Sequence, residues 1–373
     1  MLLFVLLLAS LVDRLHAVRG CHLFNNLDSK ELKAKCINPK YNFQVIPQNL
    51  NIDIVELTIN NQFIESISGK QFSHLPNLTL LDLSSNGLKS IESGTFRQLT
   101  KLTNLTLRGN RVSFERGSFF PEELPGLKNL VHLDMRFNPI ESIPDNFFNI
   151  LGASLKVMQL SSTSTEAVRI QPRAFDGLRN LVELDLSHGN LSSLPAEMRI
   201  SLDRMTHLRR LDLRGNNWNC DCNIKWLKNW LEMKLKTYNI EPYSSALGRE
   251  PILNCYYPMH LRDRPLIGLS AVSSNELRCA PSLLNKGYTI TIDQRSNLTL
   301  VCQFHADPVV SVEWYKDDKK VEHTWPNIQL SQNYTYKFDA NLTIFFVGRQ
   351  HQGRWSCAAG SGKDRVSTDY YVQ

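Results

Sequence analysis

One pattern repeats through the middle of the chain and limits the folds open to it more than any other feature. Segments such as LPNLTLLDLSSN (75–86), LTKLTNLTLRGN (99–110) and LKNLVHLDMRFN (127–138) share the order L-x-x-L-x-L-x-x-N. The L-x-L step recurs at intervals of 24 to 28 residues, beginning at Leu57, Leu81, Leu105, Leu133, Met158, Leu184 and Leu211. A regular interval of this length indicates a solenoid, in which each unit makes one turn and buries its apolar face against the next.

Each L-x-L step predicts a short strand with its leucines pointing inward and its middle residue pointing outward, because side chains alternate between the faces of a strand. The asparagine that follows can bind backbone groups of adjacent turns. This position holds Asn86, Asn110, Asn138 and Asn216, but Gln62, Thr163 and Gly189 in the other units. We therefore expect local irregularity around the fifth and sixth units. A second buried row is predicted on the return path, from Phe72/Leu75, Phe96/Leu99, Phe148/Leu151 and Phe175/Leu178.

A stacked core leaves an apolar surface at each end, and cysteines lie where the repeats stop. Cys220 and Cys222 directly follow the last repeat. A predicted helix comes next, with Ile224, Leu227, Trp230 and Leu231 on one face. This helix can cover the last turn as a lid.

These features resemble the leucine-rich repeat family, whose extracellular members have a C-terminal cap with a similar C-x-C…C…C pattern. The resemblance implies the disulfides Cys220–Cys255 and Cys222–Cys279. A zinc site built from the same four thiols is the alternative. The family's N-terminal cap usually carries four cysteines, whereas only Cys21 and Cys36 are present here, so we expect a single bridge between them.

After Cys279 the leucine period stops, and alternating segments such as NLTLVCQF (297–304) predict the strands of a sandwich. Cys302, Trp314 and Cys357 have the order and spacing of an immunoglobulin domain, which this segment resembles. The resemblance implies a Cys302–Cys357 bridge packed against the tryptophan. Trp355 stands where the family usually has its corner tyrosine. An indole N–H donates but does not accept, so we expect an altered hydrogen bond at this corner.

The predicted fold is an α/β leucine-rich repeat solenoid, a horseshoe of parallel strands with disulfide caps, followed by an all-β immunoglobulin-like sandwich. The predicted segments are a signal peptide (1–20), an N-terminal cap (21–50), about seven repeats (51–218), a cysteine-rich C-terminal cap (219–280) and a C2/I-type immunoglobulin-like domain (281–373). This order resembles the ectodomains of cell-surface adhesion and receptor proteins such as Kekkon and AMIGO.

The N-terminus and the cysteines indicate the secretory pathway. The run from Leu2 to Val12 is apolar but too short to span a bilayer, and cleavage is expected after Ala17 or Gly20. The eight cysteines fit four disulfides in an oxidising compartment. N-glycosylation sequons begin at Asn77, Asn104, Asn190, Asn297, Asn333 and Asn341. We expect a secreted protein or a cell-surface ectodomain, whose membrane anchor would have to lie beyond Gln373.

Binding rather than catalysis is the predicted function. We find no catalytic, cofactor-binding or metal-binding motif, and the net charge of +6, from 42 Lys+Arg and 36 Asp+Glu, is too small to indicate nucleic-acid binding. A glycan on Asn104 would cover the repeat strands near the third unit, so a partner should prefer the C-terminal half. The candidate partner-binding residues there are His132, Arg136, Asp185, His188 and Arg214. Alternatively, Asp and Arg on neighbouring strands pair laterally and only solubilise the sheet.

The expected partner is an extracellular protein, either a receptor ectodomain or a second copy of the chain, in adhesion or receptor modulation. The alternative is an innate immune or matrix protein that captures a glycan such as heparin. Lys316, Lys319 and Lys320, or the helix residues Lys225, Lys228, Lys234 and Lys236, could meet sulfated glycans. A solvated hairpin tip is the favoured interpretation of Lys316, Lys319 and Lys320, and the helix lysines allow the same two interpretations.

Overall fold

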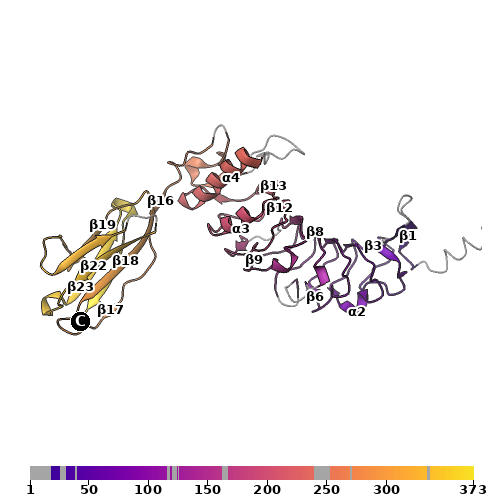
Figure 1. Cartoon of the computed structure of the whole chain (residues 1–373), viewed down its shortest axis with the longest axis horizontal. Helices are drawn as coiled ribbons and strands as arrows, with labels where there is room; N and C mark the ends of the chain where they lie inside the picture. The colour runs from indigo at the N-terminus through magenta and orange to yellow at the C-terminus, as the bar shows by residue number, and fades with distance from the viewer. Residues whose placement is uncertain are drawn as a thin grey trace, which may run out of the picture. The chain divides into compact units, whose positions relative to one another are not determined.

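The computed structural model describes residues 18–25, 31–37, 40–115, 118–119, 124, 126–161, 167–238, 253–268, 271–333 and 337–373, without the side chains of 235–238 and 337. Most of the predicted signal peptide lies outside these ranges. The chain forms two compact units (Figure 1). The first consists of Met1–Cys220 and Trp226–Val272, and the second of Asp221–Lys225 and Ser273–Gln373.

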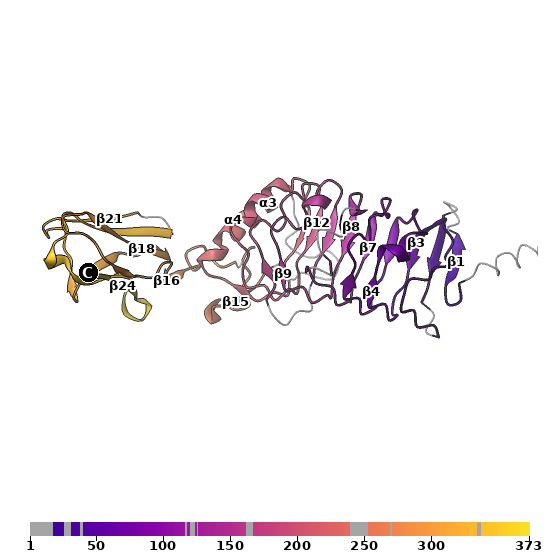
Figure 2. The same ribbon diagram turned by 90° about the horizontal axis from the view of Figure 1, so that it is seen from below.

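A nine-stranded sheet runs through the first unit in the order β1-β2-β3-β5-β7-β8-β10-β12-β13. Its strands are β1 (His22–Asn25), β2 (Leu32–Lys35), β3 (Ile54–Thr58), β5 (Leu80–Asp82), β7 (Asn104–Thr106), β8 (His132–Asp134), β10 (Val157–Gln159), β12 (Glu183–Asp185) and β13 (Arg210–Asp212). Strands β1 and β2 are antiparallel, and every later pair is parallel with one strand per turn (Figure 2). Leu57 lies opposite Leu81, which lies opposite Leu105, so the repeat interval sets the register. The predicted horseshoe of parallel strands is confirmed.

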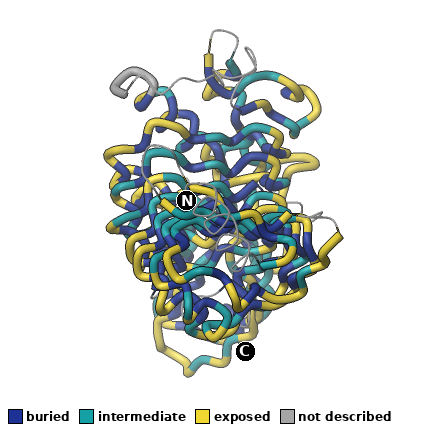
Figure 3. The backbone as a smooth tube through the Cα atoms, turned by 90° about the vertical axis from the view of Figure 1, so that its right-hand side faces the viewer, coloured by how far each residue is buried: buried dark blue, intermediate teal, exposed yellow. Residues whose placement is uncertain are grey.

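Short elements form the return path of each turn. They are the strands β4 (Ser66–Ile67), β6 (Ser90–Ile91), β9 (Ser142–Ile143) and β11 (Arg169–Ile170), and the helices α2 (Gly69–Phe72), η2 (Asn149–Leu151) and α3 (Met198–Arg204). The predicted phenylalanine row is buried, and the rings of Phe148 and Phe175 stack with centroids 6.2 Å apart. Buried and exposed residues alternate along the turns, so the buried residues of successive units form one continuous core (Figure 3).

The asparagine ladder joins consecutive turns through buried hydrogen bonds. Asn110 accepts from the backbone N–H groups of Asn86 and Leu88, each at 2.9 Å, and its amide donates to the carbonyls of Leu83 and Leu107. Where Gly189 replaces the asparagine, its own N–H donates to Asn216 of the next turn at 2.8 Å. Thr163 lies outside the described residues. The ladder therefore satisfies backbone groups that no strand or helix pairs.

The C-terminal cap contains β14 (Trp218–Asn219), η3 (Cys222–Ile224), α4 (Lys225–Tyr238), β15 (Cys255–Tyr257) and η4 (Met259–Leu261). The helix α4 buries Leu227, Trp230 and Leu231, and the Trp230 indole donates to an Asp203 carboxylate oxygen on α3 at 2.8 Å. The bridge Cys220–Cys255 fastens this cap within the first unit. The apolar face of α4 thus covers the end of the stacked core.

The second unit is a sandwich of two sheets, ordered β16-β18-β22-β21 and β17-β24-β23-β19-β20. Its elements are β16 (Cys279–Leu283), β17 (Thr289–Ile290), β18 (Leu298–Asp307), β19 (Val312–Lys316), β20 (Lys319–Lys320), β21 (Ile328–Gln332), β22 (Lys337–Ile344), η5 (Arg349–His351), β23 (Gly353–Ala359), η6 (Gly362–Asp364) and β24 (Val366–Val372). Cys302 and Cys357 form a disulfide in its core, where Trp314 is also buried. The Trp355 indole donates to the His351 carbonyl at 2.8 Å, so an N–H closes the corner in place of a tyrosine hydroxyl.

Candidate protein-binding face and the cysteine-rich cap

The outward side chains of the repeat strands form three rows on the sheet face, which we call the concave face. The middle row is Thr58, Asp82, Thr106, Asp134, Gln159, Asp185 and Asp212. The row after the second leucine is Asn60, Ser84, Arg108, Arg136, Ser161, Ser187 and Arg214, and the row before the first leucine is Glu56, Leu80, Asn104, His132, Val157, Glu183 and Arg210. The parallel register places residues of one row side by side on successive strands. A partner lying across the strands would therefore meet several rows at once.

Two of the predicted residues, Arg136 and Arg214, belong to ion pairs that run along a strand. Arg136 bonds both carboxylate oxygens of Asp134, with Nε–Oδ1 at 3.0 Å and an Nη2–Oδ2 distance of 2.7 Å. Arg214 forms the same bidentate pair with Asp212. The lateral pairing between neighbouring strands that the sequence suggested is therefore not what holds these arginines. The reason is geometric: residues two apart on a strand share a face, and the arginine fork fits both oxygens.

Asp185 occupies the equivalent position on β12 but has no such arginine. Ser187 stands two residues later, and its backbone N–H donates to Asp185 Oδ1 at 2.9 Å. Within the described chain, no lysine, arginine or histidine forms an ion pair with this carboxylate. Burial raises the pKa of Asp185, and the nearby charge of Asp212 adds to the increase. Asp212 contrasts with it: burial opposes ionisation there too, but the hydrogen bonds from Arg214 leave its pKa below the ordinary value.

His132 belongs to a chain of hydrogen-bonded polar side chains that runs across the strands. Its members come from the row before the first leucine and from the middle row. The Nε2 of His132 lies 3.4 Å from Gln159 Oε1, and the Gln159 amide donates to Glu183 at 3.2 Å. Glu183 in turn pairs with Arg210 at 3.2 Å. This chain crosses β8, β10, β12 and β13, so lateral pairing exists, though in a different row from the bidentate arginines.

His188 lies outside the strand, in the turn after β12, where its φ is 53°. It is exposed, and its ring packs so closely on Gly215 that a Cβ there would come within 2.3 Å of the imidazole. Arg108 was not a predicted site residue, yet its guanidinium lies 4.6 Å from the ring centroid of Phe137, which is 41% exposed. Phe137 occupies the variable position of the repeat directly before the asparagine. An aromatic residue at this position is the signal by which the sequence could have pointed to this contact.

Asn104, the sequon residue predicted to affect binding, lies on β7 and is partly exposed on the concave face. Its side-chain oxygen accepts from the Thr103 hydroxyl at 2.9 Å. A glycan here stays a prediction. The preference of a partner for the C-terminal half of the face, which depends on that glycan, also stays a prediction.

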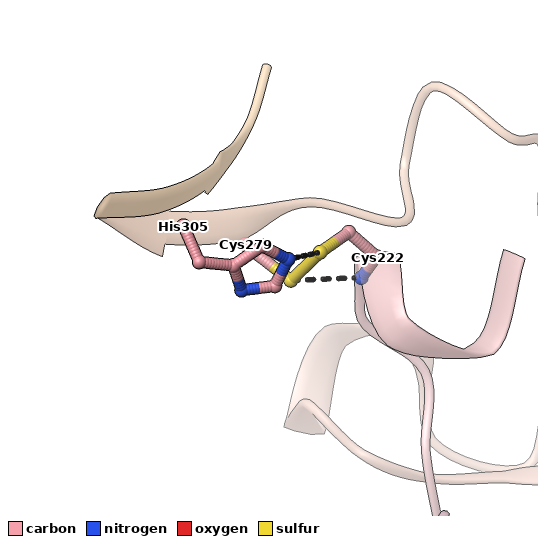
Figure 4. A group of neighbouring side chains, drawn as sticks. All are labelled: Cys222, Cys279 and His305. Carbon is pink, nitrogen blue, oxygen red and sulfur yellow. Dashed lines mark hydrogen bonds between the residues drawn. A yellow bond between two sulfur atoms is a disulfide. The ribbon is translucent and has the colours of Figure 1, made fainter. Parts of the chain in front are cut away.

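The cysteines of the cap form disulfides, so the alternative zinc site of four thiols is wrong. The pairs are Cys21–Cys36, Cys220–Cys255, Cys222–Cys279 and Cys302–Cys357. The pair Cys222–Cys279 lies within the second unit, with the imidazole Nε2 of His305 located 3.5 Å from Cys222 Sγ (Figure 4). These three side chains are the one group of at least three potential metal ligands found in the described part of the chain. Two of these three potential ligands, Cys222 and Cys279, are already joined to each other in the disulfide.

The basic residues proposed for glycan capture are mostly engaged by acidic neighbours. Lys316 pairs with Asp317 at 2.5 Å and Lys320 pairs with Glu313. On α4, Lys228 is buried and bonds Glu232 and the Leu266 carbonyl, and Lys225 pairs with Asp307 at 2.6 Å. Side chains held in this way offer less positive charge to a sulfated ligand than isolated lysines would. In the described ranges, no helix combines the length and the apolar composition that crossing a membrane requires.

Comparison with known families agrees with this architecture. The chain matches the family described as "Leucine rich repeat" over residues 53–112, 128–191 and 153–217, and the family described as "Immunoglobulin domain" over residues 281–360.

Three curated relatives match the repeat region. "Leucine-rich repeat transmembrane protein FLRT2" of Rattus norvegicus is 30% identical over 206 residues, which cover 55% of this chain and 26% of that protein. "Vasorin" of Mus musculus is 32% identical over 162 residues, or 42% of this chain and 22% of that protein. "Keratocan" of Coturnix japonica is 29% identical over 152 residues, or 40% of each chain. The matched part is thus less than half the length of each relative.

The stacked turns, the disulfide-bonded caps, the sandwich and these matches lead to one assignment. The chain is an extracellular leucine-rich repeat protein that carries an immunoglobulin domain.

Proposed function

We propose that the chain recognises an extracellular protein through the C-terminal half of the concave face, in cell-surface adhesion or receptor modulation. The observation that carries the proposal is the uneven charge balance of this half. Asp134 and Asp212 each form an ion pair with an arginine, whereas Asp185 between them forms none within the described ranges: it accepts a hydrogen bond from Ser187, and the charge of Arg136 acts on it only from a distance. A partly buried carboxylate without an ion-paired cation is unfavourable in the isolated protein, and a basic side chain of a partner would reduce that cost.

The surroundings of Asp185 favour a protein partner over a metal ion. No group of three carboxylate, histidine or cysteine side chains gathers around it in the described chain, so a divalent cation would lack ligands. The nearby side chains of Gln159 and His132, both partly exposed, supply hydrogen-bond donors and acceptors on the same face. A polar surface of this kind suits a rim of hydrogen bonds around a central charged contact.

Glycan capture has weaker support. The lysines at 316 and 320 are paired with acidic side chains, and the buried Lys228 is not presented to solvent. The mild net charge of +6 also gives no large positive field for a sulfated polymer.

The test is a binding screen of the purified chain against an array of cell-surface ectodomains that includes the chain itself, with heparin and bacterial glycans in separate wells. Two variants add the same positive charge at equivalent strand ends, Ser187→Arg beside Asp185 and Ser84→Arg beside Asp82. We expect saturable binding to at least one ectodomain, reduced tenfold or more by Ser187→Arg and no more than twofold by Ser84→Arg.

The matched pair separates a specific site from a general effect of charge. In both places the serine N–H donates to the aspartate two residues earlier, at 2.9 Å, so each arginine can form the same local pair. Saturable heparin or glycan binding without any ectodomain binding would contradict the proposal. So would an equal loss of ectodomain binding in the two variants.

A further inference from the structure

The disulfide Cys222–Cys279 differs from the other three in its surroundings. Cys220, Cys255, Cys302 and Cys357 are at most 1% exposed, and Cys21 and Cys36 are 7% and 0% exposed. Cys279 is only partly buried, and the residues that donate hydrogen bonds to its sulfur, Cys222 and Asn223, are partly buried and exposed respectively. An external thiol can therefore approach this bond more readily than the buried bridges.

Hydrogen-bond donors face the sulfur atoms of this bridge. The backbone N–H of Cys222 donates to Cys279 Sγ at 3.1 Å, and the Asn223 amide lies 3.8 Å from the same atom. On the other side, His305 Nε2 lies 3.5 Å from Cys222 Sγ (Figure 4). A thiolate formed on either cysteine would thus find a polar group already in place. Such groups stabilise thiolates and make them better leaving groups.

We propose that Cys222–Cys279 is a site of thiol–disulfide exchange for an extracellular thiol or protein dithiol. The incoming thiolate attacks the more exposed Cys279 Sγ, and the sulfur–sulfur bond breaks with its electron pair leaving on Cys222 Sγ. His305 donates a hydrogen bond to this thiolate, which then takes a proton from water. The product is a mixed disulfide between Cys279 and the external thiol.

A second external thiolate completes the exchange by attacking the external sulfur of the mixed disulfide. Cys279 leaves as a thiolate, held by the N–H of Cys222 and the amide of Asn223, and is protonated by water. In total, two thiols are oxidised to one external disulfide, and the protein disulfide is reduced to two cysteine thiols. No other oxidant or reductant is required.

Reduction would loosen the segment Asp221–Lys225 without releasing it completely. The disulfide spans 57 residues of sequence and joins this segment to the rest of the second unit. Lys225 Nζ and Asp307 Oδ2 remain paired at 2.6 Å in the same unit. The neighbouring bridge Cys220–Cys255 is fully buried, so the cap of the first unit would keep its own covalent closure.

The experiment treats the full oxidised chain with reduced glutathione, removes aliquots over time, blocks new thiols with N-ethylmaleimide and maps the labelled peptides by mass spectrometry. We expect Cys222 and Cys279 to be labelled at least tenfold faster than the six other cysteines. The variant His305→Ala should slow this labelling severalfold. The control Gln303→Ala, on the same strand and also pointing away from the core, should leave the rate unchanged.

Circular dichroism of each variant checks that it is folded, and Asn223→Ala offers an exposed second substitution beside Cys279 that should also slow the exchange. Equal labelling of all four bridges, faster labelling of a buried bridge, or an unchanged rate in both folded variants would overturn the proposal. None of these outcomes bears on the concave face, so this proposal and the proposed function stand or fall separately.

Discussion

Replacing one rung of the asparagine ladder should destabilise the solenoid far more than removing an exposed asparagine. Asn110→Ala removes four hydrogen bonds of 2.9 Å. The two carbonyls keep other partners, because Leu83 O also accepts from Asn86 and Leu107 O also accepts from Asn138. The loss therefore falls mainly on two buried N–H groups, those of Asn86 and Leu88.

Leaving a buried donor unpaired costs about 1–3 kcal/mol, so Asn110→Ala should lower the free energy of unfolding by roughly 4 kcal/mol. The control is Asn129→Ala, since Asn129 is exposed and makes a single bond, to the Thr100 carbonyl at 2.7 Å. Its loss should cost about 1 kcal/mol or less.

The assay is urea denaturation of both variants and the parent chain, followed by circular dichroism without reducing agents. The first unit contains the ladder, so its transition is the one that should move. If the two substitutions lower the free energy of unfolding by the same amount, the hydrogen bonds of the ladder are not needed to satisfy the buried backbone groups of the turns. Water entering the space left by the side chain would be the physical reason.

Four further predictions each concern a single position. Asp185→Asn should leave the protein as stable as the parent or more stable at pH 7: the raised pKa means this carboxyl group favours folding at acid pH, a contribution lost as pH rises through the folded-state pKa. Asp212→Asn should do the opposite: it should lower the stability at pH 7, and this difference from the parent should disappear as pH falls through the depressed folded-state pKa. Thermal melts of both variants and the parent between pH 3 and 8 test these expectations, and plots of stability against pH that run parallel to the parent's would contradict them. Gly215→Ala should lower the melting temperature, because φ is 64° there and the new Cβ would meet the ring of His188; an unchanged melt would show that the turn relaxes easily. Trp355→Phe should cost about 1–2 kcal/mol in the immunoglobulin-like unit by leaving a buried carbonyl without its donor, and a cost near zero in chemical denaturation would rule out a structural role for that bond.

The repeat pattern alone was enough to predict the solenoid, because a unit that cannot bury its apolar face by itself must stack on similar neighbours. The interval between leucines then sets which strands pair and in which register, as Leu57, Leu81 and Leu105 show. The lid helix was equally predictable, since Leu227, Trp230 and Leu231 share one face and are all buried. These features depend on periods and on residues close in sequence.

The candidate sites depend instead on contacts that no period encodes. The sequence predicted Arg136 and Arg214 on the binding face, but only the folded chain shows that each pairs with an aspartate two residues earlier and that, among the described residues, Asp185 has no ion-paired cation. His305 is 83 residues from Cys222 in sequence, and nothing in either segment marks them as neighbours. Side-chain reach and packing in three dimensions decide such pairings, because many aspartates, arginines and histidines satisfy the same local pattern and only a few come within bonding distance.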